Sequence, residues 1–366
     1  MKRFDEPILV TRPYLPPLDD FKKGLEEIWE NRWLTNDGPM LHKFQKELSK
    51  YLGVPETNLA LFNNGTLALE LGYYAMGLSG GDVITTPFTF VATSHALKRI
   101  GANPIFADID PETMCLSPEA AEKLITPRTK AIVPVHVYGC ACDVAGFQRL
   151  SEKYGVKIIY DAAHAFGVKS LVGCGDMSMY SFHPTKLFHS CEGGLLVFKD
   201  QSVQRKLFQL RNFAIESETE CADVGTNAKM NELQALMGLE CLKRIDDLID
   251  YRQKIYAAYE ESLSDCPQVK LVPHSQNKAY VPIFFKDFAT RERVYVELKD
   301  KRNVFSRRYF YPILTDFAPY VYAQMSCPIA HELALRVLTL PTYYDLSLSD
   351  VRTIAENVKE IVACVG

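Results

Sequence analysis

The chain has 366 residues, of which 47% are hydrophobic and 23% are charged, and its formal net charge is −4. These values are typical of a globular protein of about two domains, and they exclude a disordered chain, a coiled coil and a disulfide-stapled mini-protein. A nucleic-acid-binding protein would carry a basic domain or stripe, so we expect no nucleic-acid partner.

Ten cysteines are scattered along the sequence, and no pair has the C-x-x-C spacing of a structural zinc site. We therefore expect free thiols in a reducing compartment, and no metal site. The N-terminal residues lack the order of a signal peptide, and apolar runs such as 131–135 are far shorter than the roughly 20 residues of a membrane span. These features predict a cytoplasmic protein without a membrane partner.

The predicted elements begin with two helices. Apolar positions recur at helical spacing over 21–29, between several prolines, and again over 41–52, where the helix is expected to end at Gly53. Short apolar runs then alternate with helical segments. The expected strands are 59–63, 82–86, 104–107, 131–135 and 157–160, and the helices between them are 66–76, 93–99, 118–124 and 144–153.

This alternation is typical of a mainly parallel sheet that helices cover on both faces. Two further strands, 177–182 and 194–198, follow each other too closely for a crossover helix, so we expect part of the sheet to be antiparallel. The predicted fold class is therefore α/β, with a mixed, mostly parallel sheet.

The C-terminal third of the chain has a different pattern. Residues 228–262 predict one or two helices, and short strands at 270–272 and 280–285 precede helices over 290–298 and 349–362. We place a boundary at residue 245. Residues 1–245 then form a large domain that includes the N-terminal segment, and residues 246–366 form a smaller α+β domain.

Polar side chains gather where two of the predicted strands end. Asp161 directly follows the run 157–160, which places a carboxylate at the end of a buried strand, and small residues follow it. Lys186 follows the next strand, on a loop, because Pro184 makes continuation of a central strand unfavourable. Ligands of open α/β sheets bind beyond the carboxyl ends of the strands, so this is where we expect the site.

A lysine and a buried carboxylate at neighbouring strand ends suit pyridoxal 5′-phosphate. This cofactor needs a lysine for its Schiff base and an acid that keeps its ring nitrogen protonated. The lysine also serves as the base that moves the α-proton of the substrate. Taken singly, each residue has an ordinary structural explanation, as a cap or a surface charge, and the order of the whole set favours the cofactor.

Further residues predict how the phosphate and the ring are held. Gly65 and Thr66 open a helix directly after a strand, and the N–H groups of a helix N-terminus bind anions. Ser181 offers a second hydroxyl, and Phe90 an aromatic face for stacking. His164 and His183 lack the spacing of a zinc-binding helix, so we do not expect them to bind metal.

Six motifs in order resemble the DegT/DnrJ/EryC1/StrS family of sugar-nucleotide aminotransferases. They are Asn63–Thr66, Thr86–Thr93, Pro134–Gly139, Asp161–Gly167, Ser181–Lys186 and Glu192–Gly194. The resemblance runs from about residue 8 to the C-terminus. It implies fold type I of the pyridoxal-phosphate enzymes.

The resemblance also implies roles for individual residues. Lys186 would carry the Schiff base and Asp161 would pair with the ring nitrogen, while Phe90 would stack on the ring. Gly65, Thr66 and Ser181 would hold the phosphate. His164 stands where the family usually has glutamine, near the ring hydroxyl. Asn227 resembles the asparagine that reaches the phosphate of a neighbouring subunit, which implies a homodimer with shared active sites, although Ala228 departs mildly from the usual pattern.

Within the family, the stretches Trp33–Asn36, Phe62–Leu69 and Arg307–Pro312 are most similar to members that aminate C-4 of a dTDP-sugar. The implied reaction moves the amino group of L-glutamate to dTDP-4-keto-6-deoxyglucose, for O-antigen or other glycan synthesis. His183, Arg308 and Tyr309 are the expected substrate contacts. An alternative that the sequence leaves open is a 3-aminotransferase acting on a dTDP-3-keto-6-deoxyhexose.

Three other classes are less consistent with the sequence. A dehydratase of this fold would have histidine in place of Lys186, and a DNA-binding regulator would need a basic segment. A dinucleotide-dependent oxidoreductase would need G-x-G-x-x-G between a strand and a helix, and the glycine pairs of this chain do not form that motif.

Overall fold

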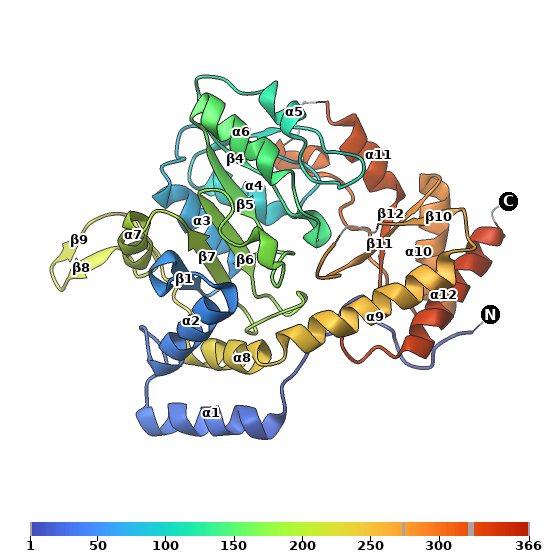
Figure 1. The fold of residues 1–366 in the computed structure, drawn as a ribbon, viewed down its shortest axis with the longest axis horizontal. Helices are drawn as coiled ribbons and strands as arrows, with labels where there is room; N and C mark the ends of the chain where they lie inside the picture. The colour runs from blue at the N-terminus through green and yellow to red at the C-terminus, as the bar shows by residue number, and fades with distance from the viewer. Residues whose placement is uncertain (1, 273–274, 321–325, 365–366) are drawn as a thin grey trace.

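A seven-stranded sheet forms the centre of the larger part of the molecule (Figure 1). The structure is a computed structural model and describes residues 2–272, 275–320 and 326–364. The strands are β1 (Leu59–Phe62), β2 (Asp82–Thr85), β3 (Asn103–Phe106), β4 (Thr129–Val133), β5 (Lys157–Asp161), β6 (Met177–Ser181) and β7 (Gly194–Phe198). All seven were predicted, with ends that differ by at most two residues.

The order of the strands is β1-β7-β6-β5-β4-β2-β3. Neighbours from β6 to β3 pair in parallel, whereas β7 is antiparallel to both β6 and β1. The prediction of a mostly parallel sheet with an antiparallel late strand is therefore confirmed. The parallel strands end at a common edge, which brings the residues that follow β2, β5 and β6 together.

Helices cover both faces of this sheet. Successive residues of β1 alternate between two buried clusters: Leu59 and Leu61 belong to one, Ala60 and Phe62 to the other. This alternation follows from the period of two of a strand with both faces buried. The helices of this part are α2 (Pro39–Leu52), α3 (Gly65–Ala75), α4 (Val91–Arg99), α5 (Pro118–Glu122), α6 (Val144–Tyr154), α7 (Ser202–Leu210) and α8 (Glu232–Leu242).

A second, antiparallel sheet of three strands lies in the C-terminal part. Its strands are β10 (Val269–Leu271), β11 (Val281–Phe285) and β12 (Val337–Leu340), in the order β10-β11-β12. The helices are α9 (Ile245–Leu263), α10 (Phe288–Arg302), α11 (Pro328–Arg336) and α12 (Leu348–Ala363), and α12 packs along α9 (Figure 1). A separate hydrophobic cluster joins α9, α10 and α12 to this sheet.

The region 228–262 contains two helices rather than one, because the chain breaks at residues 243–244 between α8 and α9. The division of the chain into domains at residue 245 stays a prediction. The first residues lie with the C-terminal sheet: Phe4 belongs to its buried cluster and Ile8 forms a parallel bridge with Val304. Helix α1 (Leu18–Asn31) follows and contacts α8 (Figure 1).

Several smaller elements connect these parts. Sequence reasoning missed α7, α11, β12 and a hairpin of β8 (Ile215–Ser217) and β9 (Glu220–Cys221). Helix α2 ends as predicted at Gly53, which has a left-handed φ of 68°. The 3-10 turns are η1 (Glu56–Asn58), η2 (Val137–Gly139), η3 (Lys169–Leu171), η4 (Leu314–Asp316) and η5 (Ala318–Tyr320).

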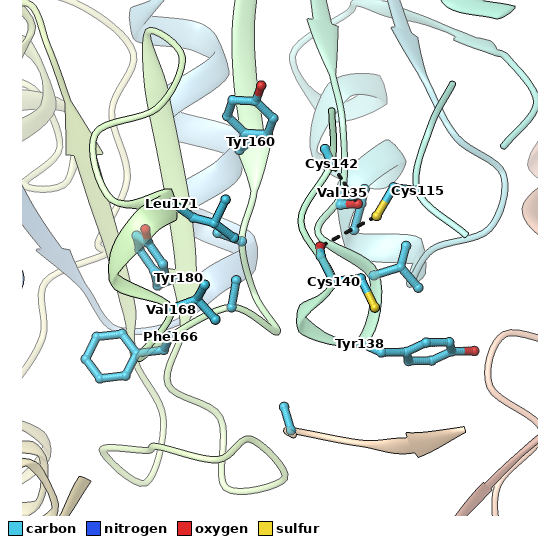
Figure 2. Packing of buried hydrophobic residues seen from close by; sticks show 14 of the residues in the cluster. Cys115, Val135, Tyr138, Cys140, Cys142, Tyr160, Phe166, Val168, Leu171 and Tyr180 are labelled. Carbon is cyan, nitrogen blue, oxygen red and sulfur yellow. Dashed lines mark hydrogen bonds between the residues drawn. The ribbon is translucent and has the colours of Figure 1, made fainter. Parts of the chain in front are cut away.

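All ten cysteines are free, as predicted. Two of the buried thiols hold the turn that follows β4 (Figure 2): Cys142 Sγ donates to the carbonyl of Val135 at 3.2 Å, and Cys115 Sγ to that of Cys140 at 3.6 Å. This turn carries Tyr138, a buried residue with a left-handed φ of 56°. None of the helices in the described ranges is long and apolar enough to cross a lipid bilayer.

Candidate active site

A cleft of about 840 Å³ lies at the carboxyl ends of the parallel strands. Every predicted site residue except Asn227 lines it. These are Gly65, Thr66, Phe90, Asp161, His164, Ser181, His183, Lys186, Arg308 and Tyr309. Residues that are more than 200 positions apart in sequence thus share one cavity, as the topology of the sheet predicts. Their individual roles stay predictions, and the geometry below gives their positions and partners.

Asp161 is the last residue of β5, and only 4% of its surface is exposed. Thr93 Oγ1, from α4, donates to Asp161 Oδ2 at 2.7 Å, and the backbone N–H of Ala163 donates to Oδ1 at 3.1 Å. Burial raises the pKa of Asp161, and these two hydrogen bonds and the charge of Lys186 oppose that rise. The carboxylate is therefore held in one orientation, where a cationic partner would favour its charged form.

Sequence reasoning missed Thr93 and its neighbour Thr89, whose hydroxyl lies 2.9 Å from that of Thr93. Thr93 lies in the first turn of α4, whereas Thr89 precedes the helix, so their proximity is a contact between loop and helix that no spacing rule in the sequence signals. Together they extend the hydrogen-bonded support of Asp161 to the loop after β2.

Lys186 lies on the loop after β6, as Pro184 predicted, and its side chain is half-buried in the cleft. Its Nζ donates a hydrogen bond to the phenol oxygen of Tyr280 at 3.2 Å. Among the described residues no carboxylate forms an ion pair with this amine. Several surface lysines of this chain are held by salt bridges, whereas Lys186 is not.

His164 is buried next to Lys186 and forms two polar contacts. Its Nδ1 accepts a hydrogen bond from the backbone N–H of Tyr138 at 3.0 Å, so in the neutral ring the proton lies on Nε2. Nε2 lies 3.3 Å from the hydroxyl of Tyr309. Burial, and secondarily the charge of Lys186, lowers the pKa of His164 well below its usual value. We conclude that this imidazole is neutral and donates from Nε2.

The turn from β1 into α3 forms the corner that was predicted to hold a phosphate. Asn64 caps the helix by accepting from the N–H of Leu67 at 2.8 Å, while the N–H groups of Gly65 and Thr66 have no acceptor among the described residues. A Cβ placed on Gly65 would lie 3.2 Å from the Cβ of Ser181, so the two residues face each other. The corner therefore offers two N–H donors beside Ser181, and Thr66 and Ser181 both line the same cleft with their hydroxyl-bearing side chains.

Three arginines line the cleft, and two of them are paired with carboxylates: Arg99 Nε donates to Glu70 Oε2 at 2.5 Å, and Arg308 is held by Glu292. Arg308 Nε donates to Glu292 Oε1 at 2.6 Å, and its Nη2 donates to the other oxygen of the same carboxylate. Its guanidinium also stacks 3.7 Å from the ring centre of Tyr295. Arg307 lines the cleft, and no acidic side chain of the described ranges pairs with it. Sequence reasoning named Arg308 and missed Arg307.

The remaining predicted residues have simple environments. His183 Nδ1 lies 2.8 Å from Thr185 Oγ1, and its Nε2 lies 3.6 Å from Glu192. Phe90 is 55% exposed at the start of α4. Asn227 is exposed outside the cleft, where its carbonyl accepts a 3.5 Å hydrogen bond from the side chain of Asn63.

Comparison with known proteins assigns this site to a family. The model of the DegT/DnrJ/EryC1/StrS aminotransferase family matches residues 18–359. The chain belongs to this family. The resemblance that the six motifs carried is thereby confirmed, together with the prediction of an aminotransferase.

Individual relatives agree with this assignment. A dTDP-4-amino-4,6-dideoxy-D-glucose transaminase from Shigella dysenteriae is 42% identical over 369 positions, which cover 98% of this chain and 100% of that protein. A crystal structure of DesI in the presence of its TDP-sugar product superposes with a TM-score of 0.92 at 34% identity, over 99% of this chain and 94% of that one. NtdA from Bacillus subtilis, solved with bound cofactor PMP, has a TM-score of 0.87 at 27% identity, over 94% of this chain and 82% of that one.

These neighbours confirm the predicted fold class, and aminotransferases of this family use pyridoxal 5′-phosphate. The residues present fit that cofactor. The cleft combines a half-buried lysine, Lys186, that has no carboxylate partner among the described residues with a buried and oriented carboxylate, that of Asp161. It also contains two backbone N–H groups, of Gly65 and Thr66, that have no acceptor among the described residues and could bind an anion. A lysine, an acid and an anion cradle are the groups that the cofactor requires.

Proposed function

We propose that this aminotransferase moves the amino group of L-glutamate to C-4 of dTDP-4-keto-6-deoxy-D-glucose. The products are dTDP-4-amino-4,6-dideoxy-D-glucose and 2-oxoglutarate. The observation that carries the proposal is the full-length similarity to the Shigella dysenteriae transaminase, which is named for this amino sugar. The cleft supports it, since a volume of about 840 Å³ suits a cofactor together with part of a nucleotide sugar.

Each group at the floor of the cleft has a task in this reaction. When bound, pyridoxal phosphate supplies the electron sink for the carbanion that forms at the amino-bearing carbon. Asp161 would hold the ring nitrogen in its protonated form, because Thr93 and Ala163 fix the carboxylate in place. Lys186 Nζ would take the proton from the amino-bearing carbon of glutamate, and in the second half of the reaction it would deliver a proton to C-4 of the sugar.

The surroundings of the ring follow from the same geometry. Gly65, Thr66 and Ser181 would bind the phosphate, and Phe90 would cover one face of the ring. The neutral His164 donates from Nε2, so it suits an anionic oxygen such as the ring hydroxylate. These roles combine the family resemblance with donors and acceptors that the cleft presents.

Arginine at the mouth of the cleft would bind the anionic part of the substrates. His183, Arg308 and Tyr309 are the predicted contacts, and Arg307 joins them. Because Glu292 already occupies Arg308, the guanidinium of Arg307 is the one available for a diphosphate or a carboxylate.

A homodimer with shared active sites is the assembly that we propose. Asn227 does not reach the cleft of its own chain, and the resemblance gives it a role at the phosphate of a neighbouring subunit. The neighbouring segments carry exposed apolar side chains: Phe213, Ile215 and Val224 are 46%, 49% and 86% exposed. Apolar surface of this kind favours contact with another subunit. We place the enzyme in the cytoplasm, and its product in O-antigen or other glycan synthesis.

The test follows nitrogen from donor to sugar. The purified protein is incubated with pyridoxal phosphate and L-[15N]glutamate, and the visible absorption band is expected to decrease. Addition of dTDP-4-keto-6-deoxyglucose should restore it, and NMR of the product should locate 15N at C-4. Lys186→Ala should abolish both changes, whereas the exposed control Lys46→Ala should keep them. Nitrogen at C-3, or turnover in Lys186→Ala, would overturn the proposal.

A further inference from the structure

A tyrosine of the C-terminal sheet region contacts the amine of Lys186. Tyr280 directly precedes β11 and is 5% exposed. Its phenol oxygen accepts the 3.2 Å hydrogen bond from Lys186 Nζ, and the amine lies 5.9 Å from the ring centre. Within the described part of the chain this is the one hydrogen bond that Nζ makes. The position of the lysine nitrogen therefore depends on a residue that no motif of the family resemblance contains.

The backbone around Tyr280 is held firmly. Arg252, a buried residue of α9, donates from Nη1 to the carbonyl of Ala279 at 2.8 Å, and Asn277 Oδ1 accepts from the N–H of Ala279 at 3.2 Å. The Nδ2 of Asn277 donates to the carbonyls of His164 and Phe166, both at 2.9 Å. The segment that carries Tyr280 is thus fastened to the loop that carries His164.

The side chain of Tyr280 is also enclosed by other aromatic rings. It packs against Tyr309, whose hydroxyl lies 3.3 Å from Nε2 of His164. The ring centres of Tyr280 and His164 are 4.6 Å apart, and those of Tyr280 and Tyr309 are 5.6 Å apart. Because rings pack on two sides, the phenol oxygen has little freedom to move away from Lys186.

We infer that Tyr280 is a positioning residue for Lys186, holding the ε-amino group at the wall of the cleft so that it meets the carbon whose proton it moves. Proton transfer depends steeply on the geometry of the base, so a freely rotating lysine would act less often in the productive orientation. The inference rests on the proposed role of Lys186 as the reactive lysine, and it names Tyr280 as the residue that orients this lysine.

The test compares Tyr280→Phe with Tyr259→Phe. The first variant keeps the ring and removes the oxygen that Lys186 contacts. The second removes an equally buried phenol whose hydroxyl donates to the carbonyl of Pro341 at 3.0 Å, outside the cleft. With saturating glutamate, Tyr280→Phe should lower kcat about tenfold and leave KM within about twofold, as expected for a loss of orientation. Tyr259→Phe should leave both unchanged.

A second readout uses the protein without cofactor, where Lys186 is labelled by reductive methylation at a single pH and the rate of labelling is quantified by mass spectrometry. Asp161, His164 and Tyr309 also face this region, and both variants retain them. Because Tyr280→Phe removes the oxygen that holds Nζ, the amine should be labelled at least about twofold faster in this variant. Tyr259→Phe should leave the rate unchanged.

Two results would overturn the inference: an unchanged labelling rate and kcat in Tyr280→Phe, or equal changes in both variants, which would show a purely structural effect. Thermal unfolding of the three proteins confirms that labelling is measured below the unfolding transition of each. Failure of the proposed function is recognised separately, because Lys186→Ala would then keep its response to glutamate.

Discussion

Gly194 is the position where β7 comes closest to the corner proposed to hold the phosphate. A Cβ at this position would lie 2.5 Å from the carbonyl oxygen of Asn64 and 2.9 Å from Cα of Gly65. Gly194 itself is fixed, because it pairs with Phe62 of β1 and with Ser181 of β6. In Gly194→Ala the turn from β1 into α3 must therefore retreat by roughly 0.5–1 Å to reach ordinary contact distances.

This displacement should affect cofactor binding more than folding. Overpacking of this kind costs about 1–3 kcal/mol of stability, whereas N–H groups that move by roughly 1 Å lose most of their hydrogen bonding to an anion. We expect the Kd for pyridoxal phosphate, from an absorbance titration of the apoprotein, to rise at least about tenfold, which corresponds to roughly 1.4 kcal/mol. Urea unfolding measures the loss of stability in parallel.

The matched control is Gly81→Ala. There the added Cβ would meet the side chain of Lys130, at 2.4 Å, which can move aside at the cost of its hydrogen bonds to the carbonyls of Gly77 and Ser79. We expect its Kd within about twofold of the wild type and its stability lower by about 1–2 kcal/mol. A Gly194→Ala protein that binds pyridoxal phosphate as tightly as the wild type would refute the placement of the phosphate at this corner.

Two further predictions concern the arginines of the cleft and the buried His136. Arg307→Ala should raise KM for the nucleotide sugar about tenfold or more without loss of stability. Arg308→Ala should mainly lower stability, by about 1–2 kcal/mol, because it leaves Glu292 with fewer partners. Steady-state kinetics and urea unfolding distinguish these two effects, and the reverse pattern would contradict the assignment. Burial lowers the pKa of His136 to about 3, so below pH 6.5 the unfolded chain binds a proton that the folded chain does not, and stability should fall with pH by up to about 1.4 kcal/mol per unit. Urea unfolding at pH 7 and 5.5 should show a smaller difference in His136→Gln, and an undiminished difference would argue against this cause.

The predicted residues that line the cleft owe their placement to local features. Asp161 follows an uninterrupted apolar strand, and Lys186 follows Pro184, so both could be placed at strand ends before any tertiary contact was known. Gly65 and Thr66 were found in the same way, because a strand and a helix meet at them. Parallel topology then brings these ends together, whatever the detailed packing.

The elements that were missed lack such local signals. Strand β12 begins at Val337 directly after α11 ends at Arg336, with no glycine or proline between them to mark a change of period. The hairpin of β8 and β9 is exposed on both faces, so its residues do not alternate between apolar and polar. Periodicity finds an element only where burial differs between its faces.

The missed site residues depend on tertiary contacts alone. Tyr280 is 94 residues from Lys186, and nothing in its surroundings in the sequence distinguishes it from the other tyrosines of the chain. Arg307 and Arg308 are neighbours of the same chemistry, and their difference arises from Glu292 of α10, which occupies only the second. Such distinctions require knowledge of which side chain is already paired.

The same contacts show why the cleft depends on the C-terminal sheet. Arg307 and Thr339 of β12 exchange two backbone hydrogen bonds, at 3.1 and 2.8 Å, so the strand anchors the arginine. The N–H of Leu314 donates to the carbonyl of Pro87, at 3.0 Å, which fastens the other end of this segment to the loop after β2. The C-terminal sheet therefore supports both the arginine proposed to face the substrate and, through Tyr280, the contact proposed to orient Lys186. A substitution that shifts this sheet should consequently change KM and kcat together, whereas Arg307→Ala and Tyr280→Phe should each change one of them.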